Sequence, residues 1–460
     1  MTAANQGLAR TGNTTGGRRS ASAFARPGMA GRLVLWGVVG INLVIVEVLY
    51  WTGDFTKNAF VWIGQFLGLH LALVMALQLV LVARLPWLDR RIGMDRLTSW
   101  HRWTGFTIFW LVLLHPTFIL LGYARLDRIP FLREFTNLSK QTPVLCGMIA
   151  AGLVIVVGIV SMRFARRRLQ YETWHTVHLA LYVVIVLAVI HQVYEGSSFK
   201  TSAVAELYWW TLWAFAIVSL IVGRIVMPLV RNARHQLRVA AVVPESDNVV
   251  SVYLIGRQLS RLNATAGQFF IWRFLGYSKW WQANPFSLSA SPDGASLRLT
   301  AKASGTTSAS LRDLPVGTRV FAEGPYGAFT SMHRIRESTL LIAGGVGITP
   351  IRALLEELTG PITVLYRVHR MSDAVLLEEL KALATMRGAR LHVLTGRTGE
   401  GNPPNNPFSP RSLSALVPDI HDRDVFVCGP PAMTTAVLRS LRELKVPSAQ
   451  VHDERFSLAS

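Results

Sequence analysis

Cysteine and charged residues are both scarce in this chain of 460 residues. There are only two cysteines, Cys146 and Cys428, and charged residues make up 16% of the sequence. Two thiols cannot hold a four-cysteine iron–sulfur cluster or an all-thiolate zinc ion, and they offer no disulfide framework. No pair of carboxylates and no nucleophile–histidine arrangement stands out, so the sequence does not indicate hydrolytic chemistry.

Apolar residues are abundant, at 51% of the chain, which is too many for a disordered protein. The formal net charge is +20, of which +14 lies in residues 1–234 and +6 in residues 235–460. Because the basic excess lies in the more apolar half, it indicates a lipid bilayer as partner, and no nucleic-acid partner is expected.

Six long apolar runs follow a polar N-terminal tail, residues 1–31, which we expect to be disordered and cytoplasmic. Each run is close to the roughly 20 residues that cross ~30 Å of hydrocarbon as a helix. We therefore predict a transmembrane domain over residues 32–234 in the inner (cytoplasmic) cell membrane. The six runs are residues 32–51, 59–83, 101–123, 143–162, 174–194 and 207–230.

Basic residues alternate between the two predicted sides of the membrane, with 18 Lys or Arg on one side and 6 on the other. Basic residues favour the cytoplasmic side, so both chain termini are predicted to be cytoplasmic. The richer side receives segments 1–32, 84–102, 163–168 and 224–238, and the poorer side receives 52–58, 124–142 and 195–206.

Histidines occur in pairs in the third and fifth apolar runs, where ionisable side chains are costly and usually functional. His101 and His115 are 14 residues apart, and His178 and His191 are 13 residues apart. At 1.5 Å per residue each pair spans about 20 Å of helix axis. His101 would then share an inner depth with His178, and His115 an outer depth with His191. Two stacked pairs of imidazoles are what two b-type haems need.

In the fifth run, the two histidines do not point to the same side of a regular helix. Fourteen residues at 100° return to within about 40° of the starting direction, but thirteen leave an offset of about 140°. We therefore expect a kink, a π-bulge or a tilt there. The residues alone leave two alternatives open: His175 as the inner ligand, and interhelical hydrogen bonds as the role of all four histidines. His70 is expected to be packed or hydrogen-bonded, while Glu47 either snorkels or moves a proton or cation.

The pattern changes after about residue 234. Residues 235–332 contain short β-branched or aromatic runs separated by turn sequences, which predicts an antiparallel β-barrel. Residues 333–460 alternate strand-like and helix-like runs, which predicts an α/β domain with a doubly wound parallel sheet. The predicted fold class is thus a multi-domain membrane protein with a six-helix transmembrane bundle, a β-barrel and an α/β domain.

A glycine-rich turn follows the first predicted strand of the α/β domain and opens its first helix. Glycines let the backbone approach a pyrophosphate, and the helix N-terminus supplies free N–H groups. The second strand ends at Arg367, where an NAD-specific site usually has an acidic residue, so NADPH is expected in preference to NADH. Arg370 or Arg397 would help Arg367 to bind the 2′-phosphate of NADPH. The alternative is that these arginines are solvated surface residues. The turn consists of Gly344, Gly345, Gly347, Ile348, Thr349 and Pro350, with Val346 between the second and third glycines.

From residue 32 to residue 456 these features resemble the NADPH oxidase / ferric reductase superfamily, including its bacterial members. In that superfamily a ferric-reductase-like transmembrane domain is fused to a ferredoxin-NADP reductase-like FAD/NAD(P) module. The resemblance implies FAD as a cofactor and two haems held by histidines of the third and fifth spans. It favours His178 over His175, and it assigns the ligands as His101, His115, His178 and His191.

Short motifs in the second half resemble the flavin and nicotinamide sites of that superfamily. Asn284-Pro285-Phe286-Ser287 resembles the flavin motif His-Pro-Phe-Ser/Thr, with Asn in place of His. Cys428-Gly429-Pro430 resembles the segment beside the nicotinamide, and Phe456 corresponds to the closing aromatic residue that covers the flavin. The resemblance thus implies catalytic roles for Cys428 and Phe456. It implies cofactor contacts from Asn284, Pro285, Phe286, Ser287, Ser289, Lys302, Gly305, Ser308, Gly429 and Pro430.

The resemblance implies a transmembrane oxidoreductase. Electrons would pass from cytosolic NAD(P)H through FAD and two b-type haems to an extracytoplasmic acceptor, either oxygen, giving superoxide, or ferric iron. The alternative is a membrane-anchored cytoplasmic NAD(P)H:flavin reductase without transmembrane transfer. The predicted outer loop, residues 124–142, is basic. It would either attract an anionic acceptor such as a ferric chelate or face lipid headgroups. Its basic residues are Arg125, Arg128, Arg133 and Lys140.

Overall fold

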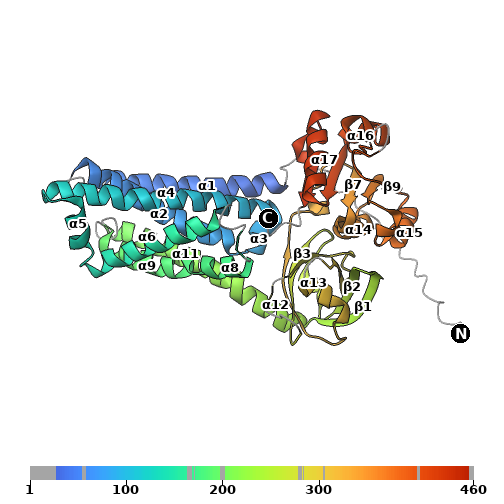
Figure 1. Ribbon diagram of the computed structural model, residues 1–460, viewed down its shortest axis with the longest axis horizontal. Coiled ribbons are helices and arrows are strands. Elements are labelled where there is room, and N and C mark those ends of the chain that lie inside the picture. Colours follow the sequence, from blue (N-terminus) through green and yellow to red (C-terminus); the bar gives the residue numbers. More distant parts are fainter. Residues whose placement is uncertain are drawn as a thin grey trace.

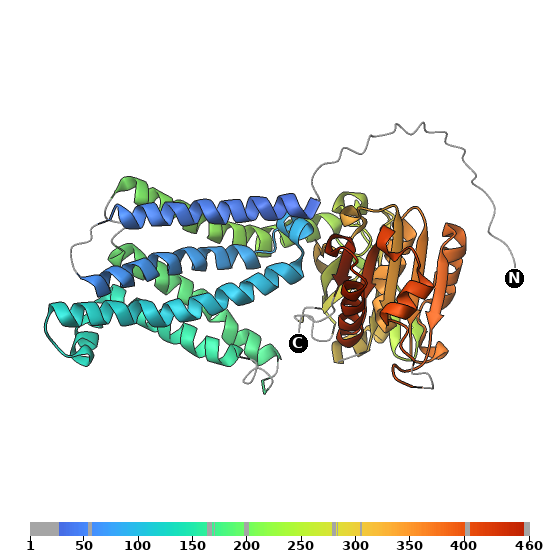
Figure 2. The same cartoon turned by 90° about the horizontal axis from the view of Figure 1, so that it is seen from above.

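A bundle of long helices forms one end of the molecule, and two domains that contain β-sheets form the other (Figure 1). Figure 2 shows the same division from a second direction. The computed structural model describes residues 27–53, 58–162, 168–169, 171–196, 202–277, 282, 284–303, 306–400 and 405–454.

Within these residues, six helical segments are long and apolar enough to cross a membrane, as the sequence predicts. Outward side chains such as Ile41, Val44 and Leu207 are more than half exposed, which suits a surface that faces lipid. The six segments are Leu33–Trp51, Ala59–Val82, Arg96–Leu126, Thr142–Ser161, Thr173–Glu195 and Ala203–His235. The helices of the bundle are α1 (Pro27–Trp51), α2 (Ala59–Val82), α3 (Pro86–Ile92), α4 (Met94–Leu126), α5 (Phe131–Leu138), α6 (Thr142–Ser161), α8 (Tyr171–Leu179), α9 (Leu181–Glu195), α11 (Ala203–Ile221) and α12 (Met227–His235).

Glycines allow α2 and α4 to pack closely. A Cβ atom at Gly64 would lie 2.7 Å from Ile119, and one at Gly122 would lie 2.5 Å from Val61. Small residues at such contacts are common between membrane helices because they let the two backbones approach. The close packing places the side chain of His115, on α4, against α2.

The fifth span is interrupted between its two predicted ligands. Helix α8 ends at Leu179 and α9 begins at Leu181. The N–H of Ala180 donates to the carbonyl of Val177 (3.1 Å), and the N–H of Val183 donates to the carbonyl of Ala180 (3.0 Å). These i→i−3 bonds are those of a tighter 3₁₀ turn, so the irregularity that the 13-residue spacing requires lies at this point.

Two three-stranded antiparallel sheets make up the first domain after the bundle, with strand orders β1-β2-β5 and β4-β3-β6. Isolated bridges join their edges, Arg238 to Arg319 and Leu288 to Leu299, but no continuous closed barrel forms among the described strands. Phe270, Trp272 and Leu299 are fully buried between the sheets. The elements are β1 (Arg238–Ser246), β2 (Val249–Ile255), β3 (Phe269–Phe274), β4 (Asn284–Ser287), β5 (Ser296–Lys302), α13 (Thr306–Ser310) and β6 (Val320–Tyr326).

The last domain confirms the predicted parallel sheet, with strand order β11-β10-β7-β8-β9 and helices on both faces. Successive residues of β7 point to opposite faces, so Leu341 joins the core beneath α14 and Leu340 joins the core beneath α17. The elements are β7 (Ser338–Gly344), α14 (Ile348–Glu357), β8 (Ile362–Arg367), α15 (Leu377–Arg387), β9 (Arg390–Leu394), α16 (Pro410–Leu416), β10 (Arg423–Cys428), α17 (Pro431–Glu443) and β11 (Val451–Glu454).

Polar contacts hold the bundle to strand β6 of the first sheet domain. Glu323 forms ion pairs with Arg84 of the bundle (2.7 Å) and with Arg273 of β3. The side-chain amide of Asn232, on α12, both donates to and accepts from the backbone of Ala322 (2.8 Å each). These contacts fix the sheet domain against one end of the bundle.

Candidate functional site

The inner pair of histidines comes together from two helices. His101 on α4 and His178 on α8 have ring centroids 6.0 Å apart and ring planes inclined at 75°. Trp174 stacks on His178 at 5.1 Å. The side-chain amide of Gln78 donates to the carbonyl of His101 (2.9 Å), which ties this part of α4 to α2.

The outer pair has the same arrangement nearer the other end of the bundle. His115 on α4 and His191 on α9 have ring centroids 6.4 Å apart and planes inclined at 68°. Nδ1 of His115 donates to the carbonyl of Gly64 (2.8 Å), and Nδ1 of His191 donates to the carbonyl of Pro143 (3.0 Å). Because a carbonyl oxygen only accepts, Nδ1 must carry the proton, which leaves Nε2 with a lone pair for a metal.

The geometry of both pairs fits a metal held between two imidazoles. Metal–nitrogen bonds of about 2.0 Å on either side would separate the ring centroids by about 6 Å. Glycines also make room for both outer imidazoles. A Cβ at Gly68 would lie 2.8 Å from the ring of His115, and one at Gly147 would lie 2.8 Å from the ring of His191. At the inner pair, Nδ1 of His101 is buried with no hydrogen-bond partner among the described residues.

Haem ligation by these histidines stays a prediction. Among the residues that the structure describes, no group of three or more His, Cys, Asp or Glu side chains is placed to hold a metal ion. A haem with two axial histidines does not require such a group.

His70 is occupied by other contacts. Its Nδ1 lies 2.9 Å from the carbonyl of Phe66, and its Nε2 lies 3.2 Å from a carboxylate oxygen of Glu47. The structure thus places Glu47 and His70 together, on α1 and α2.

The predicted flavin motif forms strand β4, at the edge of its sheet. Asn284 donates to the carbonyl of Gln282 (3.1 Å), Pro285 is exposed, Phe286 is half-buried and Ser287 is buried. The indole of Trp272 donates to the carbonyl of Phe286 (3.1 Å) and holds this edge to β3. The partly open Pro285-Phe286 pair leaves an apolar surface available to a flat ring.

Ser289 and Arg298 form a buried network behind this edge. Arg298 donates to the hydroxyl and to the carbonyl of Ser289 (3.0 and 2.7 Å), and the hydroxyl of Thr300 also donates to Ser289 (2.8 Å). Arg298 continues to Glu379 on α15 (2.8 Å), so it links the two sheet domains. Arg298 is not among the residues predicted from the sequence; the one available signal was a charged residue inside the apolar run of β5.

The remaining predicted flavin contacts are spread over β5 and α13. Lys302, at the end of β5, is exposed and Ser308, on α13, is half-buried. Gly305 lies outside the described residues. These positions stay predictions.

The glycine-rich turn and the Cys428 segment meet at the carboxyl edge of the parallel sheet. A Cβ at Gly347 would lie 2.3 Å from the carbonyl of Cys428, and one at Gly429 would lie 3.1 Å from Gly344. Gly345 has a positive φ of +53° and open space where a Cβ would be, so its backbone is accessible to a ligand. Helix α14 begins directly afterwards at Ile348, followed by Thr349 and Pro350, all three buried.

Arg367 lies where the sequence predicts it, at the end of β8. It is 9% exposed, and one guanidinium nitrogen donates to the carbonyl of Thr395 (2.6 Å). The other terminal nitrogen is buried without a hydrogen-bond partner among the described residues. Burial lowers the pKa of Arg367 from its usual value, and an anionic ligand would satisfy this group.

Cys428 is fully buried at the end of β10, beside Ala343 on one side and Glu454 on the other. Pro430 follows at the start of α17. Phe456 lies outside the described residues. The outer-loop residues Arg125, Arg128, Arg133 and Lys140 are all exposed.

Comparison with known proteins identifies three parts of the chain. Residues 67–189 match the family "Ferric reductase like transmembrane component", residues 233–330 match "FAD-binding domain", and residues 341–439 match "Oxidoreductase NAD-binding domain". The three matches follow the order in which the sequence predicts these kinds of domain, and the predicted boundaries stay predictions.

Two similar proteins are named as a ferredoxin reductase component and an electron transfer component. The ferredoxin reductase component of 3-ketosteroid-9-alpha-monooxygenase from Mycobacterium tuberculosis is 32% identical over 48% of this chain and 65% of its own length. The electron transfer component of toluate 1,2-dioxygenase from Pseudomonas putida is 25% identical over 50% of this chain and 70% of its own length. The chain therefore spans less than two thirds of the first of these relatives.

A solved structure, the FAD/NAD-binding domain of nitric oxide dioxygenase from Vibrio cholerae, is 24% identical; it aligns over 48% of this chain and 99% of its own, with a TM-score of 0.39. The matched families and the six spans together establish the domain organisation. The chain has a ferric-reductase-like transmembrane domain followed by FAD- and NAD-binding domains.

Proposed function

We propose that this chain carries electrons across a cell membrane, from cytosolic NAD(P)H through FAD and two b-type haems to an acceptor on the far side. The observation that supports this most is the facing of His101 with His178 and of His115 with His191, at ring-centroid distances of 6.0 and 6.4 Å. Two such pairs at two depths provide two successive sites between the sides of the membrane. Both termini and the nucleotide-binding domains lie on the cytoplasmic side in this proposal.

The cofactors supply the redox chemistry: when bound, FAD converts the two electrons of a hydride into single electrons, which haem iron accepts. The protein supplies position. The carbonyls of Gly64 and Pro143 fix the orientation of the outer imidazoles. Gly345 lets the backbone approach a pyrophosphate, and Arg367 offers a buried cation for the 2′-phosphate of NADPH, which we propose as the preferred donor.

The acceptor would react at the far end of the bundle. Helix α5 lies at the end of the bundle opposite the sheet domains (Figure 1). Arg125 is in the last turn of α4, Arg133 is on α5, and Arg128 lies between the two helices. If both imidazoles of each pair hold the metal of a haem, the acceptor would be reduced without binding to that metal. The exposed cations would attract an anionic ferric chelate or stabilise superoxide formed from oxygen.

Replacing His115 with alanine tests the electron path. The variant should lose one of two haems, measured by the pyridine haemochrome method against protein. Reduction of an impermeant ferric chelate should be lost, because the outer site is the last step before the acceptor. Reduction of FAD by NADPH should be unchanged in stopped-flow traces.

His70→Ala is the matched control, since it also removes an imidazole from the bundle but one that bonds to Phe66 and Glu47. It should keep both haems. Ferric reduction that survives in His115→Ala would show that electrons leave by another route.

A second candidate is a membrane-anchored NAD(P)H:flavin reductase without transmembrane transfer. The names of the relatives favour it, since they are a ferredoxin reductase component and an electron transfer component. This candidate predicts that the purified protein contains FAD but lacks the Soret and α-band absorbance of a low-spin b-type cytochrome. The two functions therefore separate in one absorbance spectrum.

A further inference from the structure

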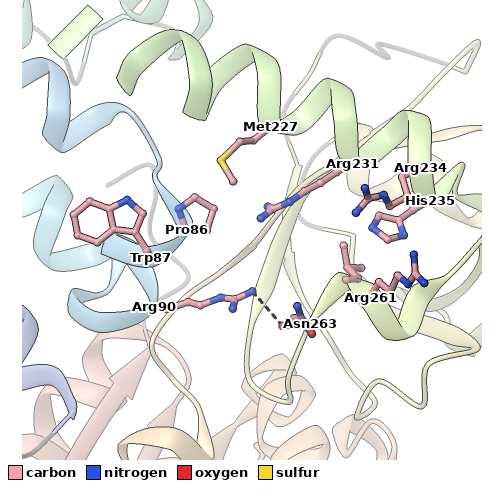
Figure 3. A pocket seen from close by; sticks show the side chains of 10 residues that line it. Pro86, Trp87, Arg90, Met227, Arg231, Arg234, His235, Arg261 and Asn263 are labelled. Atoms are coloured by element: carbon pink, nitrogen blue, oxygen red, sulfur yellow. Dashed lines mark hydrogen bonds between the residues drawn. The ribbon is translucent and has the colours of Figure 1, made fainter. Parts of the chain in front are cut away.

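A basic cavity lies where the helical bundle meets the first sheet domain. Its volume is about 390 Å³, and it is formed by α3, α12 and the short turn Leu259–Leu262 (Figure 3). Among the described residues, none of those proposed to hold a cofactor lines it. Four of the residues that line it are arginines: Arg90, Arg231, Arg234 and Arg261.

Carboxylates do not neutralise these arginines. Within the part of the chain that the structure describes, none of the four forms an ion pair. Arg90 donates to the carbonyl of Asn263 (3.2 Å), and its Nε is buried without a hydrogen-bond partner among the described residues. Arg231 donates to the carbonyl of Gly324. Figure 3 shows Arg90 and Arg231 reaching toward the same space from different elements.

Four guanidinium groups around one concave site repel one another unless an anion lies between them. Guanidinium groups match phosphate in shape, because their N–H donors form paired bonds to its oxygens. The chemistry that this cavity recognises is therefore a phosphate group.

An apolar surface that suits lipid adjoins the cavity. Trp87, at its rim, is 53% exposed, and Met227 also lines it. Val226 and Val230, on the helical turns just before Arg234 and on the same side of the helix as that arginine, are 43% and 53% exposed. The sequence thus passes from lipid-facing residues to arginines within two turns, and tryptophan is enriched at the same depth in membrane proteins. The cavity consequently lies at headgroup level.

We propose that this cavity binds the phosphate of an anionic phospholipid, with the acyl chains lying along the exposed apolar face before Arg234. Basic pockets next to transmembrane helices are suited to such headgroups. A bound lipid would neutralise the arginines between the bundle and the flavin domain and so hold the two together. The proposal does not depend on electron transfer or on haem.

Native mass spectrometry of the full-length protein tests this. The protein is released from detergent micelles that contain equal amounts of phosphatidylglycerol and phosphatidylcholine with identical chains. The wild-type protein should retain phosphatidylglycerol preferentially. The double variant R234Q/R261Q should reduce that retention about tenfold or more, since each arginine near a membrane surface contributes roughly fivefold.

The matched control is R96Q/R102Q, which removes two exposed arginines from α4 at the same end of the bundle but outside the cavity. It should retain the lipid like the wild type. R234K/R261K keeps the charge but loses the paired N–H donors, so its retention should lie between that of R234Q/R261Q and that of the wild type, which separates loss of charge from misfolding. An equal loss in both glutamine variants, or no preference for phosphatidylglycerol in the wild type, would overturn the proposal.

A third arm distinguishes the sources of the phosphate. Inorganic phosphate and glycerol phosphate are added at millimolar concentration before the measurement. The lipid should remain bound, because its chains contribute to binding. Displacement of the lipid by either soluble phosphate would show that the cavity serves a soluble anion and would overturn the assignment to a lipid.

Discussion

Replacing Gly147 with alanine should disturb the outer histidine pair and leave the rest of the molecule intact. A Cβ at Gly147, on α6, would lie 2.8 Å from the His191 ring, whereas ordinary van der Waals contact begins near 3.4 Å. The imidazole must therefore move by about 0.6 Å, which exceeds the roughly 0.5 Å within which a functional constellation has to be held. The same movement strains the 3.0 Å hydrogen bond from His191 to Pro143.

The assay is haem content and NADPH-driven ferric reduction of the purified variant. We expect the outer haem to be lost or weakly bound and ferric reduction to fall at least about tenfold, as for other disturbed supports of metal ligands. Reduction of FAD by NADPH should be unchanged. Gly152→Ala is the control on the same helix, because a Cβ there meets nothing within 4 Å. A Gly147→Ala protein with two haems and full ferric reduction would refute the reasoning.

Three further predictions concern the soluble domains and their attachment. Glu323→Gln removes the negative charge that pairs with Arg84 at a largely buried contact between the bundle and the first sheet domain. The loss should cost about 3 kcal/mol of stability at this contact. Stopped-flow traces should show slower haem reduction but normal flavin reduction. Arg367→Ala should raise the KM for NADPH about tenfold or more and leave that for NADH nearly unchanged in steady-state assays, and equal effects on both would contradict the proposed role. For Glu379, burial alone would raise the pKa, but the hydrogen bonds and charges of Arg298 and Arg352 together outweigh it, and the pKa is lowered overall. The contribution of Glu379 to stability is therefore present above its unfolded pKa and is lost as pH falls through the lower folded value, so Glu379→Gln should make thermal unfolding less sensitive to acid pH.

The sequence predicts the parts of this protein that depend on spacing along one chain segment. Counting residues places four histidines at two depths, and the structure pairs His101 with His178 and His115 with His191. The same holds for the glycine-rich turn, which follows a strand and opens a helix at Ile348. Local order is enough in both cases because helix rise and strand–turn–helix geometry are regular.

Contacts between distant segments were not predicted. Hydropathy gives the length of a span but not its rotation, so nothing in the sequence shows that Gly147 supports His191. The partners Arg84 and Glu323 are 239 residues apart, and only the docking of two domains brings them together. The hydroxyl of Ser289 accepts a hydrogen bond from Arg298, a partner that strand periodicity does not reveal. The predicted contact of Ser289 with the cofactor stays a prediction.

The spacing of the histidines explains why one of the two spans that carry them is continuous and the other is interrupted. Fourteen residues on α4 nearly complete four turns, so His101 and His115 share a face of one uninterrupted helix from Met94 to Leu126. Thirteen residues fall about 140° short of four turns at 100° per residue. A 3₁₀ turn rotates by about 120° per residue, so the i→i−3 bonds at Ala180 add rotation in the direction that closes this gap. The bend between α8 and α9 must supply the remainder, so the break at Ala180 is what allows His178 and His191 both to face α4.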